Sequence, residues 1–211
     1  MINGVHTKQE LELQELFSRS FSFDSICKYQ SGIKFDCPNK QKCEVADDEP
    51  CYTPFIGSPN TMVMVVGEAP STANSHGAYC GGLFSEIERN MGETSIMKSR
   101  VDWIRDFVNT EFKCTPHFTD LAKCGLSNQK YKKKLKYRFG KCYEYFLRFE
   151  IEIIKPEIIL FVGLNLEKEI GNDIEGAAKK VRFLYHYSKN NCAIHKNNRD
   201  IMFEKWREQL C

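Results

Sequence analysis

Four short segments rich in apolar and β-branched residues predict strands. They cover residues 61–66, 118–122, 158–162 and 181–185. The third is apolar throughout and is followed by Gly163, which is typical of a central strand that is buried on both faces. Such strands are the building blocks of a parallel sheet.

Around these strands, apolar residues recur at helical spacing. The pattern predicts helices over residues 8–19, 83–91, 101–112, 141–154, 166–170 and 199–210. Pro156 is expected to end the fourth of them. The alternation of strands and helices predicts an α/β protein, a three-layer α/β/α sandwich with a central, mostly parallel four-stranded sheet.

The chain length bounds the domain organisation. With 211 residues, the chain is long enough for one substantial core. We expect an N-terminal helical, Cys-rich extension over residues 1–36, followed by one α/β domain over residues 37–211. No apolar run reaches the roughly 18 to 20 residues of a membrane span, and the amino terminus is polar rather than signal-like. These features predict a cytoplasmic monomer without a membrane partner.

Positive charge is concentrated in one stretch, although the net charge is only +2. The basic residues are Lys130, Lys132, Lys133, Lys134, Lys136, Arg138 and Lys141. Tyr131 and Tyr137 alternate with them, as suits a surface that meets phosphates and a base or sugar. A solvated helix face is the alternative interpretation.

The ten cysteines are many for an intracellular chain, where disulfides are disfavoured. We therefore interpret the cysteines as candidate ligands of a metal ion or of a metal cluster. Cys27, Cys37, Cys43 and Cys51 crowd the N-terminal third of the chain. The five-residue gap between Cys37 and Cys43 differs from the usual two-residue gap of a zinc knuckle, so spacing alone leaves the metal open.

A carboxylate follows the first predicted strand, in the segment Gly67-Glu-Ala-Pro70. Ligand sites of open α/β sheets lie beyond the carboxyl ends of the strands, so Glu68 is a candidate catalytic residue. The alternative is an ordinary turn with a solvated glutamate.

Four segments, taken in order, resemble the uracil-DNA glycosylase superfamily, and especially its iron-sulfur family 4 branch. They are Val-Gly-Glu-Ala-Pro at 66–70, Phe-Thr-Asp-Leu-Ala-Lys-Cys at 118–124, Lys-Pro-Glu-Ile-Ile-Leu-Phe-Val-Gly at 155–163 and Tyr-His-Tyr-Ser at 185–188. The resemblance runs from about Cys37 to the C-terminus. It implies a DNA glycosylase that flips a pyrimidine out of DNA, hydrolyses its N-glycosidic bond and leaves an abasic site.

The resemblance also implies a [4Fe-4S] cluster, with zinc as the alternative. Its ligands, transferred by position, are Cys37, Cys43, Cys124 and Cys142. The first pair is more widely spaced than in the family, so Cys51 or Cys27 could replace Cys37. A cluster between Cys124 and Cys142 would hold the Lys-rich segment as a clamp on the DNA backbone.

Glycosidic bond cleavage develops positive charge on the sugar and negative charge on the departing base. By resemblance, Glu68 positions a water or stabilises the sugar cation, and His186 hydrogen-bonds O2 of the leaving pyrimidine. A core histidine is the alternative for His186. Tyr187 replaces the family's proline, while Ser71 and Ser188 are expected to bind DNA phosphates.

Asp120 stands where uracil-specific relatives carry asparagine. An asparagine amide accepts from N3–H of uracil and donates to O4, whereas an ionised aspartate only accepts. Asp120 would therefore repel uracil O4 and accept from the N4 amino group of cytosine. The alternatives are that Asp120 caps a turn or is protonated, and that the chain is a uracil-DNA glycosylase of base-excision repair.

The loop after Pro70 is also altered relative to the family. Cys80 takes the place of the ring that stacks on the base, and Tyr79 that of the preceding proline; Ala69 and Asn74 complete the expected base pocket. A smaller wall leaves room for a bulky modified cytosine, such as one in viral DNA, which would suggest antiviral defence. A further alternative is a non-catalytic iron-sulfur DNA-binding module.

Overall fold

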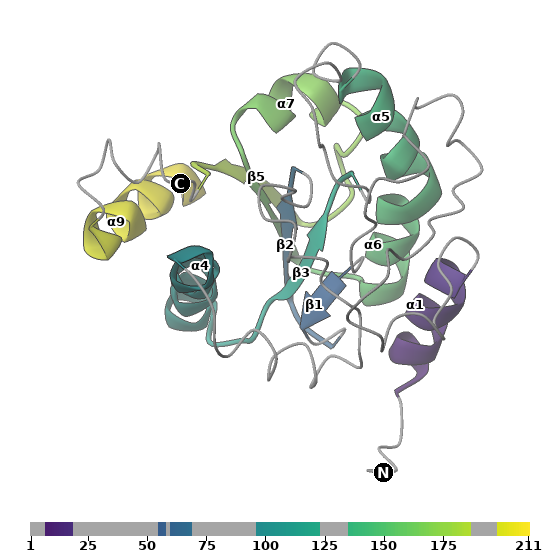
Figure 1. Ribbon diagram of the computed structural model, residues 1–211, viewed down its shortest axis with the longest axis horizontal. Coiled ribbons are helices and arrows are strands. Elements are labelled where there is room, and N and C mark those ends of the chain that lie inside the picture. The colour runs from purple at the N-terminus through teal and green to yellow at the C-terminus, as the bar shows by residue number, and fades with distance from the viewer. Residues whose placement is uncertain (1–6, 19–54, 58–59, 69–95, 123–134, 187–197) are drawn as a thin grey trace.

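The computed structural model describes residues 7–18, 55–57, 60–68, 96–122, 135–186 and 198–211 (Figure 1). Its strands are β1 (Phe55–Gly57), β2 (Val63–Gly67), β3 (His117–Asp120), β4 (Ile158–Val162) and β5 (Lys180–Leu184). They form one sheet in the order β1-β3-β2-β4-β5. The pairs β2·β3, β2·β4 and β4·β5 are parallel, which confirms an α/β protein with four parallel strands.

β1 is a fifth strand, which the hydrophobic pattern does not predict. It pairs antiparallel with β3, with Phe55 opposite Thr119 and Gly57 opposite His117. With three residues it is too short for an alternating pattern to stand out, and Pro54 directly before it argues against a strand interior. Within the described ranges the sheet therefore has five strands rather than the predicted four.

The helices of the described ranges are α1 (Lys8–Ser18), α4 (Ile96–Phe112), α5 (Leu135–Cys142), α6 (Arg148–Ile154), α7 (Asn165–Ile170) and α9 (Arg199–Leu210), with a π-helical turn, η3 (Tyr143–Leu147), between α5 and α6. α1, α7 and α9 lie where the sequence predicts helices. α4 begins before the predicted start at residue 101, and the helix predicted over 83–91 lies outside the described residues. None of the described helices is long and apolar enough to cross a membrane.

The helix that precedes β4 begins earlier than the sequence predicts. The sequence predicts a helix from about residue 141, whereas α5 begins at Leu135. Phe139 and Cys142 of α5 are buried in the core. Their burial against the sheet stabilises the helix. The many charged residues nearby make its buried positions hard to recognise in the sequence.

Pro156 ends this helix as predicted. Lys155, the residue before it, adopts a left-handed conformation with φ of 53°, and its N–H donates to the Ile151 carbonyl oxygen over 2.7 Å. A residue before proline avoids the helical region, so the chain leaves α6 here and enters β4.

Alternate residues of the central strands face opposite sides of the sheet and fill two hydrophobic clusters. The first cluster includes Met64, Val66, Ile159 and Phe161, and the second includes Val63, Val65, Leu160 and Val162. Residues of α1, α5, α6 and α7 complete the first, and residues of α4 and α9 complete the second (Figure 1). Burial on both faces explains why β2 and β4 are nearly continuous apolar runs.

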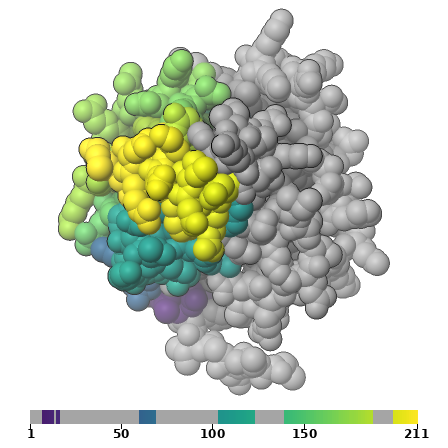
Figure 2. Space-filling model, turned by 90° about the vertical axis from the view of Figure 1, so that its left-hand side faces the viewer, coloured from purple at the N-terminus to yellow at the C-terminus, as the bar shows by residue number. Residues whose placement is uncertain are grey.

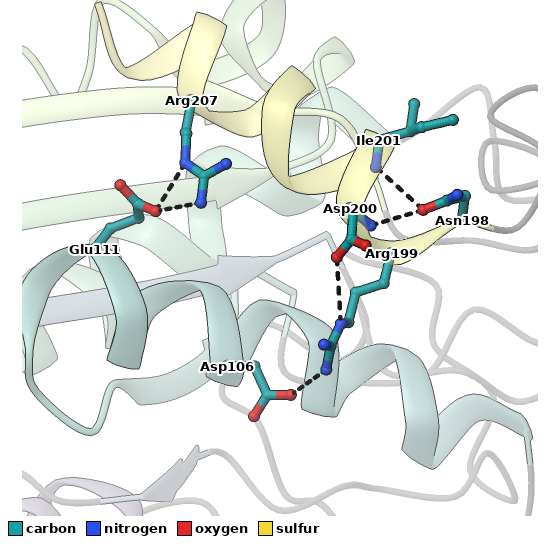
Figure 3. Close-up of polar contacts among 7 residues, drawn as sticks. All are labelled: Asp106, Glu111, Asn198, Arg199, Asp200, Ile201 and Arg207. Atoms are coloured by element: carbon teal, nitrogen blue, oxygen red, sulfur yellow. Dashed lines mark hydrogen bonds and ion pairs between the residues drawn. The ribbon is translucent and has the colours of Figure 1, made fainter.

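α9 lies along α4 on one face of the molecule, where Figure 2 shows both helices side by side. Two ion pairs join them, Arg199 to Asp106 at 3.3 Å and Arg207 to Glu111 at 2.8 Å (Figure 3). The Asn198 side chain caps the start of α9 by accepting from two backbone N–H groups of the first turn. Ion pairs on the surface contribute only about 0.2–1 kcal/mol each, so these contacts set orientation more than stability.

Aromatic packing stabilises the contact between α4 and α9 more than the two ion pairs do. The Phe107 ring contacts the rings of Phe203 and Trp206 edge-on, at centroid distances of 5.4 and 5.2 Å. Phe107 and Trp206 are fully buried. Truncation of a buried Phe or Trp to Ala costs about 3–5 kcal/mol, so this aromatic cluster contributes more to holding α9 than the two surface ion pairs do.

Candidate functional site

The strand order creates a topological switch point between β2 and β4. The two strands are neighbours in the sheet. The next described helix after β2 is α4, which contributes to one hydrophobic cluster, whereas the helix after β4 is α7, which contributes to the other. Where neighbouring parallel strands send the chain to opposite faces, a crevice opens beyond their carboxyl ends. Glu68 and Gly163 come directly after these two strand ends.

The backbone of Glu68 is held beside β3. The Leu121 N–H donates to the Gly67 carbonyl oxygen over 2.9 Å, and the Ala122 N–H donates to the Glu68 carbonyl oxygen over 3.0 Å. These bonds continue the β2–β3 ladder beyond both strand ends. The residue itself is partly exposed. The fold therefore presents Glu68 at the carboxyl ends of β2 and β3, on a backbone that is held by hydrogen bonds.

Asp120 lies directly beside this position. It ends β3 and is the register partner of Gly67 in the parallel pair. A Cβ atom added to Gly67 would overlap the Asp120 Oδ1 atom. The carboxylate of Asp120 thus lies across the backbone of Gly67, and a larger residue at position 67 would require the carboxylate to move.

Replacement of Gly67 by alanine tests this placement. The added methyl group must displace the Asp120 carboxylate, and we expect the free energy of unfolding to fall by about 1–3 kcal/mol, the usual cost of overpacking. Urea unfolding measures the change. Gly140→Ala is the matched control, because nothing lies within 4 Å of a Cβ atom there, and in a helix this exchange should stabilise by about 0.5–1 kcal/mol. Equal loss in both variants would contradict the placement of Asp120.

Gly163 lies directly after β4 in a backbone conformation that favours glycine. Its φ of 139° lies in a region that residues with a side chain rarely adopt. Its N–H donates to the Leu184 carbonyl oxygen over 2.9 Å, and its carbonyl oxygen accepts from the Leu166 N–H over 3.0 Å. β4 separates β2 from β5. Neighbouring strands lie about 4.8 Å apart, so the strand ends that lead to Glu68 and His186 flank Gly163 with roughly 10 Å between them.

His186 follows the end of β5 and is partly buried. Burial lowers its pKa below the ordinary value of 6.5. The imidazole is therefore mainly neutral at pH 7, with one ring nitrogen protonated and the other not. Because the folded pKa is the lower one, this group destabilises the fold only as the pH drops below 6.5 toward the folded pKa. A neutral, desolvated imidazole is well suited to donate a hydrogen bond to an oxygen that gains negative charge.

Of the predicted metal ligands, the structure describes Cys142. Its thiol is buried, with 7% of the residue exposed, at the end of α5 and directly before the π-helical turn η3. Such turns occur often at functional sites. Within the described ranges, no group of three or more His, Cys, Asp or Glu residues is arranged to hold a metal ion.

The remaining predicted site residues fall outside the part of the chain that the structure describes. They are Cys37, Cys43, Ala69, Ser71, Asn74, Tyr79, Cys80, Cys124, Lys130, Lys132, Lys133, Lys134 and Ser188. Glu68, Asp120, Cys142 and His186 are the described members of the predicted site. The first two are adjacent, and His186 lies across the switch point from them.

A buried pair of titratable side chains is not predicted by the sequence motifs. His117 and Glu150 are both fully buried, and the Nε2 and Oε2 atoms lie 3.9 Å apart. They connect the start of β3 to α6, at the opposite end of β3 from Asp120. Buried charges are rarely found without partners. The position of Glu150 at helical spacing from the buried Leu147 and Ile154 is the sequence signal for this pair.

No protein-family model matches the chain, and no curated protein matches it.

Proposed function

We propose that this protein is a DNA glycosylase that hydrolyses the N-glycosidic bond of a pyrimidine and leaves an abasic site. The main support is the position of Glu68, on a fixed backbone beside Asp120, at the carboxyl ends of two adjacent strands. The neutral His186 flanks the same switch point from the end of β5. The order of the motifs, which resembles the iron-sulfur branch of the uracil-DNA glycosylases, supports the same proposal.

The proposed reaction has two charged centres. The bond between C1′ of the sugar and N1 of the base breaks with its electron pair moving to the base, and the oxygen of a water molecule forms the new bond to C1′. The Glu68 carboxylate stabilises the positive sugar or accepts the water proton. His186 donates a hydrogen bond to O2 of the departing base. The base must first leave the helix, because C1′ is shielded in the duplex.

Asp120 determines which base fits the site in this proposal. Its carboxylate accepts hydrogen bonds and cannot donate while ionised. The N4 amino group of cytosine offers the donor that this carboxylate needs, and O4 of uracil offers a second acceptor. A buried acceptor without a donor costs about 1–3 kcal/mol, more for a charged group. A cytosine-type base is therefore the proposed substrate, and a bulky modified cytosine fits the altered loop after Pro70.

Base release from defined oligonucleotides tests the activity. Single- and double-stranded DNA containing uracil, cytosine or 5-substituted cytosines is incubated with the protein, and free base is measured by mass spectrometry. We expect release of a modified cytosine. Release of uracil alone would instead support a uracil-DNA glycosylase of base-excision repair, and tight DNA binding without release of any base would support a non-catalytic module.

A [4Fe-4S] cluster is the cofactor that we propose, held by Cys37, Cys43, Cys124 and Cys142. The buried thiol of Cys142 fits such a ligand, because clusters are shielded from solvent by the protein around them. The cluster would serve a structural role and would anchor the Lys-rich segment against DNA. The proposal also includes a three-layer α/β/α domain that acts as a cytoplasmic monomer.

Iron and sulfide analysis and an absorption spectrum test the cluster. We expect a brown protein with broad absorbance in the visible range, and loss of the colour in Cys142→Ser. Cys114→Ser is the matched control, since Cys114 contacts the Thr61 hydroxyl at 3.8 Å and is not a proposed ligand. A colourless protein that contains stoichiometric zinc would favour zinc in the same ligands.

A further inference from the structure

We infer that the C-terminal helix α9 positions His186, and that Trp206 and Gln209 are the positioning residues. The inference rests on the proposed function of His186 as the donor to the departing base. It adds residues that are distant in sequence from the strand ends to the residues that serve the site. None of the motifs that resemble the glycosylases includes α9.

Both backbone groups of Tyr185, the residue before His186, are bound by side chains of α9. The Trp206 Nε1–H donates to the Tyr185 carbonyl oxygen over 2.9 Å. The Tyr185 N–H donates to the Gln209 Oε1 atom over 2.8 Å. These two hydrogen bonds hold the backbone on both sides of Tyr185. They therefore fix the direction in which the chain leaves β5 and the position of the His186 backbone.

The two side chains can act in this way because α9 itself is firmly held. Trp206 is fully buried against Phe107 of α4, and the Arg207–Glu111 ion pair lies one residue away (Figure 3). At the end of the helix, the Arg182 Nε–H of β5 donates to the Leu210 carbonyl oxygen over 3.2 Å. The last turns of α9 are therefore tied to α4 and to β5 at the same time.

The arrangement matters because β5 ends just before the candidate site. The last register pair between β4 and β5 joins Val162 and Leu184, so His186 lies two residues beyond the paired part of β5. The hydrogen bonds from α9 hold Tyr185, the residue between that pair and His186. A displacement of a catalytic group by about 1 Å can lower a rate by roughly 100-fold, so a fixed exit from β5 has a direct effect on the proposed reaction.

Gln209→Met tests the inference. Methionine has a similar length but no strong acceptor for the Tyr185 N–H, and position 209 is partly exposed, so the fold should tolerate it. Trp206→Phe is the second variant, which removes the N–H donor and keeps an aromatic ring. Glu208→Met is the matched control, because Glu208 pairs with Lys205 on the outer side of the helix.

Two readouts are taken on the full-length protein. The first is the NMR titration of the His186 imidazole, assigned by comparison with His186→Asn among the five histidines of the chain. The second is base release as a function of pH, with kcat and KM determined separately. Loosening of the segment should hydrate His186, so its pKa should rise toward 6.5. The acid limb of the rate profile should then move to higher pH.

We expect Gln209→Met to shift the His186 titration upward and to lower kcat on the order of 10-fold, with little change in KM. Trp206→Phe should act in the same direction, and Glu208→Met should change neither quantity. An unchanged titration and an unchanged rate in the folded Gln209→Met variant would overturn the inference. If no base is released by the wild type while the titration shifts, the positioning role is supported and the proposed function is contradicted.

Discussion

Replacement of Glu68 by glutamine is expected to lower the rate of base release on the order of 1,000-fold. Glutamine keeps the shape of the side chain and the backbone bonds of residue 68, but it removes the negative charge that the sugar cation needs. The rate is measured under single-turnover conditions with excess protein, so that product release does not mask the chemical step.

Glu157→Gln is the matched control for this variant. Glu157 precedes β4 at the end of the sheet opposite the site, and its exposed carboxylate pairs with Lys179 at 3.3 Å. The control should keep the wild-type rate. Equal rates for Glu68→Gln and the wild type would show that the switch-point carboxylate takes no part in the reaction, whatever base is released.

Asp120→Asn is expected to change the base that leaves. The amide can donate to O4 and accept from N3–H, so preference should move from a cytosine-type base toward uracil. A site built on one hydrogen-bonding pattern can reject the other by a factor of 10,000 or more, and we expect a change in the ratio of kcat/KM values on the order of 1,000-fold. Competition between two labelled oligonucleotides in one reaction measures the ratio directly.

The control for this exchange is Asp173→Asn, on the exposed turn after α7. It removes a similar charge from an exposed residue that is not part of the candidate site and should leave the preference unchanged. A wild-type protein that already prefers uracil, together with an Asp120→Asn variant that does the same, would contradict the role of Asp120 in base selection.

Long apolar runs made the central part of the fold predictable. β2 and β4 are buried on both faces, and for this reason apolar residues follow one another along both strands. β1 shows no such apolar run, because it has three residues and lies at the edge of the sheet, where it pairs with β3. The start of α5 was hidden for a different reason: its charged residues mask the buried Phe139 and Cys142.

The candidate site was predictable residue by residue but not in its arrangement. Glu68 follows an obvious strand, so its place at a sheet edge could be predicted. Its nearness to Asp120 depends on the register of β2 against β3 and on the close approach to Gly67. The buried His117–Glu150 pair likewise joins elements that are distant in the chain.

The sequence by itself determined the α/β class, the four parallel strands and the candidate residues. The reason is that the residue types at consecutive positions indicate both the local periodicity and the burial on both faces. Only the tertiary structure decided the strand order, and with it the switch point that places Glu68 and His186 on either side of Gly163. It also decided that α9 holds the segment before His186 through Trp206 and Gln209. Those contacts join residues about twenty positions apart, and no local pattern specifies which distant side chains will meet once the core has packed.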